Sequence, residues 1–223
     1  MTVRRLALLG LGILGLVSCS SVPFRQTALV SLEGIDPERM RQDFAEALPV
    51  AFRVVNTVTF RFKRKAFVAI GYTDVDASRE TFTVVGLHPA GGVKLFEISG
   101  NGEEVECAFA LDEFAGRGDV ARAVGDDTRR MYFDRLPSAD ARVSRERNRI
   151  LFREEDGPGE LEYVFAGSDG VLVEKRYYEK GRRVWRASYY EYRRENGKLY
   201  PGGIILEHHE YGYRLLVRLR EIW

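Results

Sequence analysis

Most of the chain beyond Pro49 consists of short segments in which apolar and polar residues alternate, and this pattern restricts the fold more than any other feature. Alternation with a period of two predicts strands that have one buried face and one wet face. The first strands are expected over residues 58–72, 81–87, 93–98 and 104–111, with residues 58–72 forming one long strand or a hairpin. The turns between them are too short for a crossover helix, so consecutive strands should pair antiparallel.

Two segments have helical spacing instead. Asp36 followed by Pro37 predicts an N-cap and the first helical residue, and the helix should end before Pro49. Its apolar positions are Met40, Phe44, Ala47 and Leu48. A second helical segment is predicted over residues 118–135, with a break at the Gly-Asp-Asp sequence of residues 125–127.

The alternating pattern resumes after the second helical segment. Strands are expected over residues 149–152, 161–165, 171–178, 183–192, 203–209 and 213–222, with turns rich in Gly, Asp and Asn between them. The predicted fold class is therefore α+β and mostly β. It has one helix, four or five strands, a helical insert and about six further strands.

The N-terminus has the three parts of a secretory signal: Arg4 and Arg5, an apolar stretch over residues 6–17, and small residues before Cys19. The apolar stretch is shorter than the roughly 20 residues of a spanning helix. It ends in Leu-Val-Ser-Cys at residues 16–19, which resembles the lipobox of bacterial lipoproteins. We expect a signal peptide over residues 1–18, a lipidated Cys19 with a tether over residues 19–35, and a single domain over residues 36–223.

The lipobox resemblance implies that the Cys19 thiol and the new amino terminus carry acyl chains such as palmitate, which anchor the mature protein to a membrane. Ser20 follows the cysteine where an aspartate would imply retention in the inner membrane, so an outer-membrane, periplasm-facing location is expected. Two alternatives stay open: an ordinary signal peptide whose cysteine is incidental, and an N-terminal membrane anchor.

Composition excludes some functions. The 34 basic and 33 acidic residues nearly balance, so no nucleic-acid partner is predicted. Once Cys19 carries the lipid, Cys107 is the one cysteine left, so no intramolecular disulfide is available. Cys107 alternates with Val105 and Phe109, which favours a buried thiol over a nucleophile.

No catalytic or metal-binding constellation is recognisable. The histidines are His88, His208 and His209, and the adjacent pair would point to opposite faces of a strand. Nucleophile elbows, phosphate loops and dinucleotide fingerprints are missing from the sequence. We therefore predict a protein that is not an enzyme and uses no cofactor.

The order of elements, on a lipoprotein, resembles the LolA/LolB superfamily of periplasmic lipoprotein carriers and outer-membrane lipoprotein receptors. The closest local similarity is the proline-led apolar segment at residues 199–206, followed by alternating hydrophobic residues at 213–219. The resemblance implies a curved antiparallel sheet, an incomplete β-barrel closed by helices, whose apolar interior accepts acyl chains. The loop at residues 87–92 is short and offers only Leu87, whereas the outer-membrane receptor has an exposed hydrophobic loop there.

An acyl-binding cavity would be lined by the apolar strand positions. The candidates are Phe60, Phe62, Val68, Ile70, Phe82, Val84, Phe109, Tyr163, Phe165, Leu206, Leu215 and Val217. The same residues could instead pack into a solid core, because alternation alone does not distinguish the two arrangements.

Aromatic and basic residues mix in residues 175–194, and Arg176, Trp185 and Arg186 are candidates for a surface that contacts lipid headgroups or glycan. The alternative is an exposed sheet face stabilised by cross-strand pairs. The predicted function is binding of lipid, or of the acyl chains of lipoproteins, in envelope transport. A non-catalytic scaffold that holds an envelope protein partner is the alternative.

Overall fold

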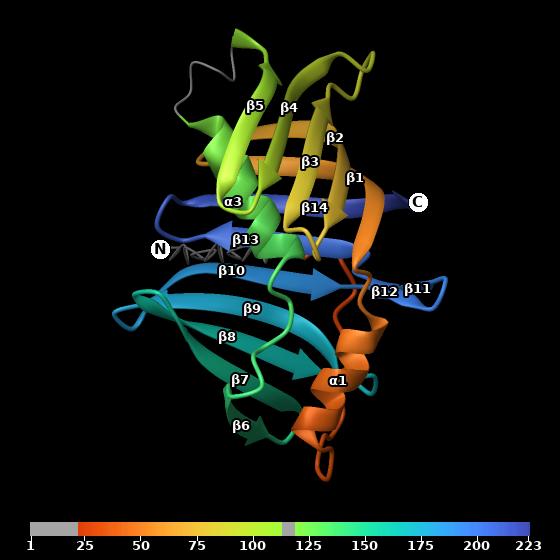
Figure 1. The fold of residues 1–223 in the computed structure, drawn as a ribbon, viewed down its shortest axis with the longest axis vertical. Helices are drawn as coiled ribbons and strands as arrows, with labels where there is room; N and C mark the ends of the chain where they lie inside the picture. Colours follow the sequence, from red (N-terminus) through yellow and green to blue (C-terminus); the bar gives the residue numbers. More distant parts are fainter. Residues whose placement is uncertain (1–21, 113–118) are drawn as a thin grey trace, which may run out of the picture.

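A single antiparallel sheet of twelve strands dominates the molecule (Figure 1). The structure, a computed structural model, describes residues 22–112 and 119–223. The predicted signal peptide and Cys19 lie outside these residues. No helix within them is long and apolar enough to cross a bilayer.

The sheet contains the long strands of both halves of the chain. Its first half comprises β1 (Ala51–Phe62), β2 (Lys65–Asp76), β3 (Thr81–Leu87), β4 (Lys94–Asn101) and β5 (Glu104–Ala110). Its second half comprises β6 (Arg142–Glu146), β7 (Arg149–Asp156), β8 (Gly159–Ala166), β9 (Val171–Glu179), β10 (Arg182–Tyr190), β13 (Gly203–His208) and β14 (Tyr213–Ile222). A separate short pair is formed by β11 (Arg193–Glu195) and β12 (Lys198–Tyr200). The helices are α1 (Pro37–Ala47) and α3 (Val120–Tyr132).

The strand order is β5-β4-β3-β2-β1-β14-β13-β10-β9-β8-β7-β6, so the sheet is open and β5 and β6 are its edges. The last strand, β14, pairs with β1 from Val54 opposite Ile222 to Phe62 opposite Tyr213. The connection from β5 to β6 must therefore pass from one edge to the other. It does so across the inner face, where α3 and α1 cover the curved sheet (Figure 1). The predicted incomplete barrel closed by helices is confirmed.

The first helix begins and ends as predicted. The side chain of Asp36 accepts a hydrogen bond from the Glu38 amide at 3.1 Å, and Pro37 is the first helical residue. The buried side of α1 packs on the inner face of the sheet. There the ring of Phe44 meets Phe165 edge-on at 5.3 Å.

The second helix differs from the prediction, because α3 runs through residues 125–127 without a break. A Cβ atom on Gly125 would lie 2.7 Å from Val105 Cγ2, so this glycine allows the helix to approach β5 closely. The expectation that Cys107 is buried is also wrong, because Cys107 is exposed. The short strands β6, β11 and β12 were not expected, since exposed polar residues dominate β6 and β11.

Residues 22–35 are mostly exposed but contact the sheet at two points, Phe24 and Leu32. Phe24 is buried on the outer face, stacked on Tyr190 with ring centroids 5.4 Å apart. Leu32 is buried in the main core, and its amide donates to the Arg147 carbonyl at 2.9 Å. A chain that starts at Ser20 thus retains every described element.

Replacing Phe44 by alanine should lower the free energy of unfolding by about 3–5 kcal/mol, because the ring is 2% exposed and its removal leaves a cavity against Phe165. Urea unfolding followed by circular dichroism measures the change. Arg39→Ala, on the exposed side of the same helix, is the control and should be nearly neutral. Equal midpoints for the two variants would contradict the packing described for α1.

Candidate functional site

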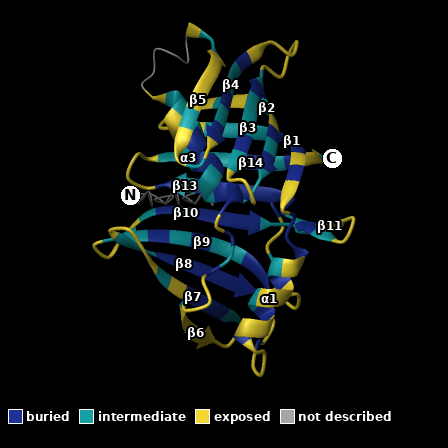
Figure 2. Ribbon diagram, viewed as in Figure 1, coloured by how far each residue is buried: buried dark blue, intermediate teal, exposed yellow. Residues whose placement is uncertain are grey.

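The site is the inner face of the sheet beneath α1 and α3, where much of the sheet is buried (Figure 2). Most predicted lining residues lie on this face. Those buried in it are Phe82, Tyr163, Phe165, Leu206 and Val217, with Val84 and Leu215 partly buried against them. Phe60 pairs with Leu215 and so shares this face, and Phe62 lies at the exposed end of the β1–β2 hairpin. Strands from both halves of the chain therefore supply the inner face.

Three predicted lining residues lie elsewhere. The turn between β1 and β2 pairs Phe60 with Phe67 and Thr59 with Val68, so even-numbered positions switch faces at the hairpin. Val68 and Ile70 are consequently on the outer face. Phe109 is 39% exposed, because an irregularity in the β4–β5 pairing places it opposite Glu97.

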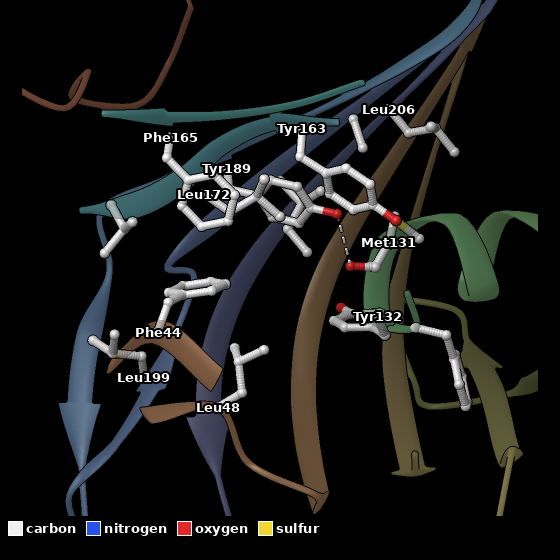
Figure 3. Packing of buried hydrophobic residues seen from close by; sticks show 14 of the residues in the cluster. Phe44, Leu48, Met131, Tyr132, Tyr163, Phe165, Leu172, Tyr189, Leu199 and Leu206 are labelled. Atoms are coloured by element: carbon white, nitrogen blue, oxygen red, sulfur yellow. Dashed lines mark hydrogen bonds between the residues drawn. The ribbon is translucent and has the colours of Figure 1, made fainter. Parts of the chain in front are cut away.

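The inner face is filled by side chains in this conformation. Figure 3 shows residues of α1, α3 and the strands packed around Tyr163 and Tyr189. A cavity bordered by Phe52, Asn56 and Tyr132 among others, beneath the end of α3, has a volume of about 10 Å³. That space suits about one water molecule, whereas small-molecule pockets enclose roughly 300–1,000 Å³. An acyl chain therefore has no preformed space here.

Polar bonds join the C-terminal end of α3 to the sheet. The Tyr189 hydroxyl donates to the Met131 carbonyl at 3.1 Å (Figure 3). The Lys175 ammonium donates to the carbonyls of Phe133 at 3.0 Å and Asp134 at 3.1 Å. Carbonyls at a helix C-terminus lack intrahelical partners, and a cation there interacts favourably with the helix dipole. Lys175 and Tyr189 thus hold the helical cover closed.

Basic side chains outnumber acidic ones inside the site. Lys175 and Arg135 are both buried, and Arg130 lies over the Trp185 ring at 5.8 Å. Among the described residues buried on this face, Asp127 is the acidic one. It accepts from Arg130 at 2.8 Å and from the Tyr213 hydroxyl at 2.8 Å.

Burial shifts both kinds of charge toward neutrality. It lowers the pKa of Lys175 to about 8, because its ammonium has left water and faces carbonyl oxygens rather than a contacting carboxylate. It raises the pKa of Asp127 to about 6, even though Arg130 and Tyr213 oppose that shift. The interior therefore contains a lysine that would gain from a negatively charged partner.

Arg176, Trp185 and Arg186 do not form one surface, which corrects the prediction. Trp185 is 6% exposed on the inner face, where it stacks on Tyr177 with centroids 5.8 Å apart. Arg176 is on the outer face, paired with Glu174 and Glu162, and Arg186 is paired there with Glu207. Successive residues of a strand point to opposite faces, which separates Trp185 from Arg186.

The histidines are held by structural contacts. His208 is buried and stacks on Tyr211 and Tyr213, and burial lowers its pKa to about 4. The Arg183 guanidinium donates to His209 Nε2 at 2.9 Å. Within residues 22–112 and 119–223, no three His, Cys, Asp or Glu side chains are grouped so that they could hold a metal ion.

Sequence reasoning did not single out Lys175, Asp127 or Arg135 as site residues. Lys175 did carry a usable signal, because it alternates with Tyr177 and Val173 on a strand whose inner positions are otherwise apolar. The sequence pattern predicts Asp127 at a helix break. The structure instead places it at the contact between α3 and β14.

Lys175→Met should change how stability depends on pH. Between pH 8 and 10.5 the folded wild type has released the Lys175 proton while the unfolded chain keeps it, so wild-type stability rises with pH there. Methionine has no titratable proton, so the variant avoids the cost of a buried charge and should be more stable than wild type at low pH. This excess in unfolding free energy should fall by about 3 kcal/mol across the window.

Urea titrations from pH 7 to about 11 measure this difference, and tyrosine ionisation largely cancels because wild type and variant share those groups. Lys198→Met is the matched control. The Lys198 ammonium also donates to a carbonyl, that of Glu46 at 2.6 Å, but this hydrogen bond is exposed to solvent. Parallel pH curves for wild type and Lys175→Met would refute the assignment of Lys175 as a buried cation.

Comparison with known proteins gives a fold relationship. Neither a protein-family model nor a curated protein sequence matches the chain. A LolA superfamily protein from Nitrosomonas europaea is similar with a TM-score of 0.55 and 15% identity, over 83% of this chain and 91% of that one. A domain described as an outer membrane lipoprotein-sorting protein, from Vibrio parahaemolyticus, has a TM-score of 0.49 and 6% identity, over 83% and 90%. The open curved sheet closed by helices on its inner face is therefore the fold of the LolA superfamily, and this chain has that fold.

Proposed function

We propose that this protein is a non-catalytic, lipid-anchored envelope protein that binds a lipid, or the acyl chains of a lipoprotein, between its curved sheet and its helices. The observation that carries the proposal is the apolar inner face, covered by a helix that polar bonds fasten to the sheet at its C-terminal end. The LolA-type fold supports the same function. Attachment to the outer membrane, facing the periplasm, completes the proposal.

Binding beneath the helices requires the cover to move, because the cavity bordered by Phe52, Asn56 and Tyr132 has a volume of only about 10 Å³. The movable part is α3 with the segment that follows it. That part is joined to β9 and β10 by the bonds of Lys175 and Tyr189. An acyl chain that took its place would regain apolar contact with the sheet, worth roughly 25 cal/mol for each Å² removed from water. The observed affinity is reduced by the fraction of time the cover is closed.

Lys175 indicates which kind of headgroup such a ligand carries. When the cover moves, the ammonium loses the carbonyls of Phe133 and Asp134, and an acidic headgroup can replace them. An ion pair in this setting satisfies a charge that is otherwise buried without a contacting carboxylate. The ligand class favoured is thus an amphiphile with a carboxylate or phosphate next to its acyl chain.

The purified chain from Ser20, prepared without detergent, should bind octadecanoic acid more tightly than octadecanol. Lys175→Met should reduce that preference by about tenfold, because it removes one charge-assisted hydrogen bond. Isothermal titration measures both ligands. Lys198→Met, which removes a lysine outside the inner face, is the control and should keep the wild-type preference.

Absence of binding by either ligand, together with no lipid in mass spectra of the purified chain, would reject the acyl-binding proposal. The second candidate, a scaffold for an envelope protein, would then be favoured by the packed interior. Equal binding of acid and alcohol would reject the role of Lys175 alone.

The anchor makes a separate prediction. Cys19→Ser should remove the acyl chains and release the protein from the outer-membrane fraction, because anchoring of this kind needs the covalent lipid. Intact mass spectrometry and membrane fractionation measure the two effects. Cys107→Ser is the matched control and should leave both unchanged. A Cys19→Ser protein whose intact mass still includes the acyl chains would contradict lipidation at this residue.

A further inference from the structure

The N-terminal segment meets the fold on the outer face of the sheet, opposite the helices. Phe24 lies against Gly203, where a Cβ atom would be only 2.4 Å from its ring. The Arg218 guanidinium covers the ring at 4.5 Å, and its Nη2 donates to the Pro23 carbonyl at 2.7 Å. The chain that leads back to Cys19 therefore leaves from this outer face.

An apolar patch lies on the same face, across β14, β1, β2 and β3. We call it the outer patch, and it consists of Val68, Ile70, Tyr72, Val85, Leu87 and Leu216. Register places Val68 opposite Thr59, which pairs with Leu216, and it places Ile70 opposite Leu87 and Tyr72 opposite Val85. Val68 is 40% and Tyr72 37% exposed, although large apolar side chains on a sheet are usually covered.

A basic hairpin borders the outer patch. It comprises Arg61 on the outer face, Lys63 and Arg64 in the β1–β2 turn, and Lys65, which pairs with the exposed Phe62 on the inner side at the end of the hairpin; all four basic residues are exposed. None of the four basic residues forms an ion pair with another residue in the described part of the chain. The Lys63 ammonium instead lies over the Phe62 ring, 5.0 Å from its centroid. Four positive charges next to exposed apolar side chains are typical of surfaces that enter the headgroup region of a bilayer.

The outer patch is close to the point where the chain leaves the fold. Gly203, beneath Phe24, pairs with Arg218, Arg218 pairs with Thr57, and Thr57 pairs with Ile70. Ile70 is thus three strands from Gly203, or about 14 Å at the usual strand spacing. Cys19 precedes Val22 by three residues, which span at most about 10 Å. A bilayer that holds a lipid on Cys19 would be within reach of the outer patch.

We propose that the outer face of the sheet docks on the membrane, with the outer patch among the lipid headgroups and the basic hairpin against anionic phosphates. The inner face and its helices then point away from the bilayer. The orientation rests on lipidation of Cys19, but affinity for an anionic lipid surface is a property of the folded chain itself.

Charge favours a lipid surface over a second copy of the chain as the occupant. A symmetric dimer through the outer patch would bring two basic hairpins to one interface, where like charges repel. Acidic groups on this face do not neutralise the hairpin. Glu207, two strands from Arg61 by register, pairs with Arg186 and Arg214. Asp74 pairs with Arg53.

Flotation with vesicles tests the proposal on the chain from Ser20, which lacks the anchor. Wild type should float with vesicles of phosphatidylglycerol and phosphatidylcholine, and less with phosphatidylcholine alone. The double variant Val68→Ser, Tyr72→Ser and the double variant Lys63→Glu, Arg64→Glu should each lower the bound fraction about tenfold. Val143→Ser with Arg182→Glu is the control, because it changes an exposed valine and an exposed arginine far from the outer patch.

Flotation of all variants at the wild-type level would overturn the proposal. A second result would also overturn it: wild type does not bind vesicles, sediments as a dimer, and the double variant Val68→Ser, Tyr72→Ser sediments as a monomer. A second copy of the chain would then cover the outer patch. Failure of the acyl-binding proposal is distinguishable. The proposed site for octadecanoic acid is on the opposite face of the sheet. A wild-type chain that fails to bind this acid should therefore still float with vesicles.

Discussion

The pairing of β1 with β14 is the constraint on which the rest of the structure depends. These strands come from opposite ends of the described chain, and their register from Val54–Ile222 to Phe62–Tyr213 joins two meanders into one sheet. The cost of closing so long a loop rises only slowly with its length, and many ladder bonds offset it. Once the two halves are joined, β5 and β6 lie at opposite edges, and the connection between them crosses the inner face. That path places α3 over the apolar side chains.

Much of this fold can be predicted from the sequence, because alternation and turn chemistry are local. The long strands and α1 with its Asp36 cap are where the pattern places them. The face of the sheet to which each residue points is harder to predict, since it depends on strand register. The hairpin that follows Phe62 places Val68 and Ile70 on the outer face instead of the predicted inner face, and an irregular pairing does the same for Phe109. Gly125 resembled a helix break because a glycine needed for close packing has the same local appearance as one that ends a helix.

The charges of the candidate site are only partly visible in the sequence, for a related reason. Outer and inner positions alternate along β9 and β10, so Arg176 and Arg186 face glutamates while Lys175 faces the core. On the outer face, a row of arginines and glutamates runs across neighbouring strands through Arg153, Glu162, Arg176, Arg186 and Glu207, and those charges compensate each other. The inner charge is compensated by main-chain carbonyls at the end of a helix. Only the tertiary structure reveals that difference.

The unpaired edges of the sheet have a mechanical consequence. In a closed barrel the number of strands and their stagger determine the radius. Here β5 and β6 do not pair with each other, so the sheet can flatten or curl while every ladder bond is kept. The interior volume is then an elastic quantity, governed by how far the two edges are apart and by the helix that bridges them. A packed core and a spacious one become two curvatures of the same hydrogen-bonded sheet.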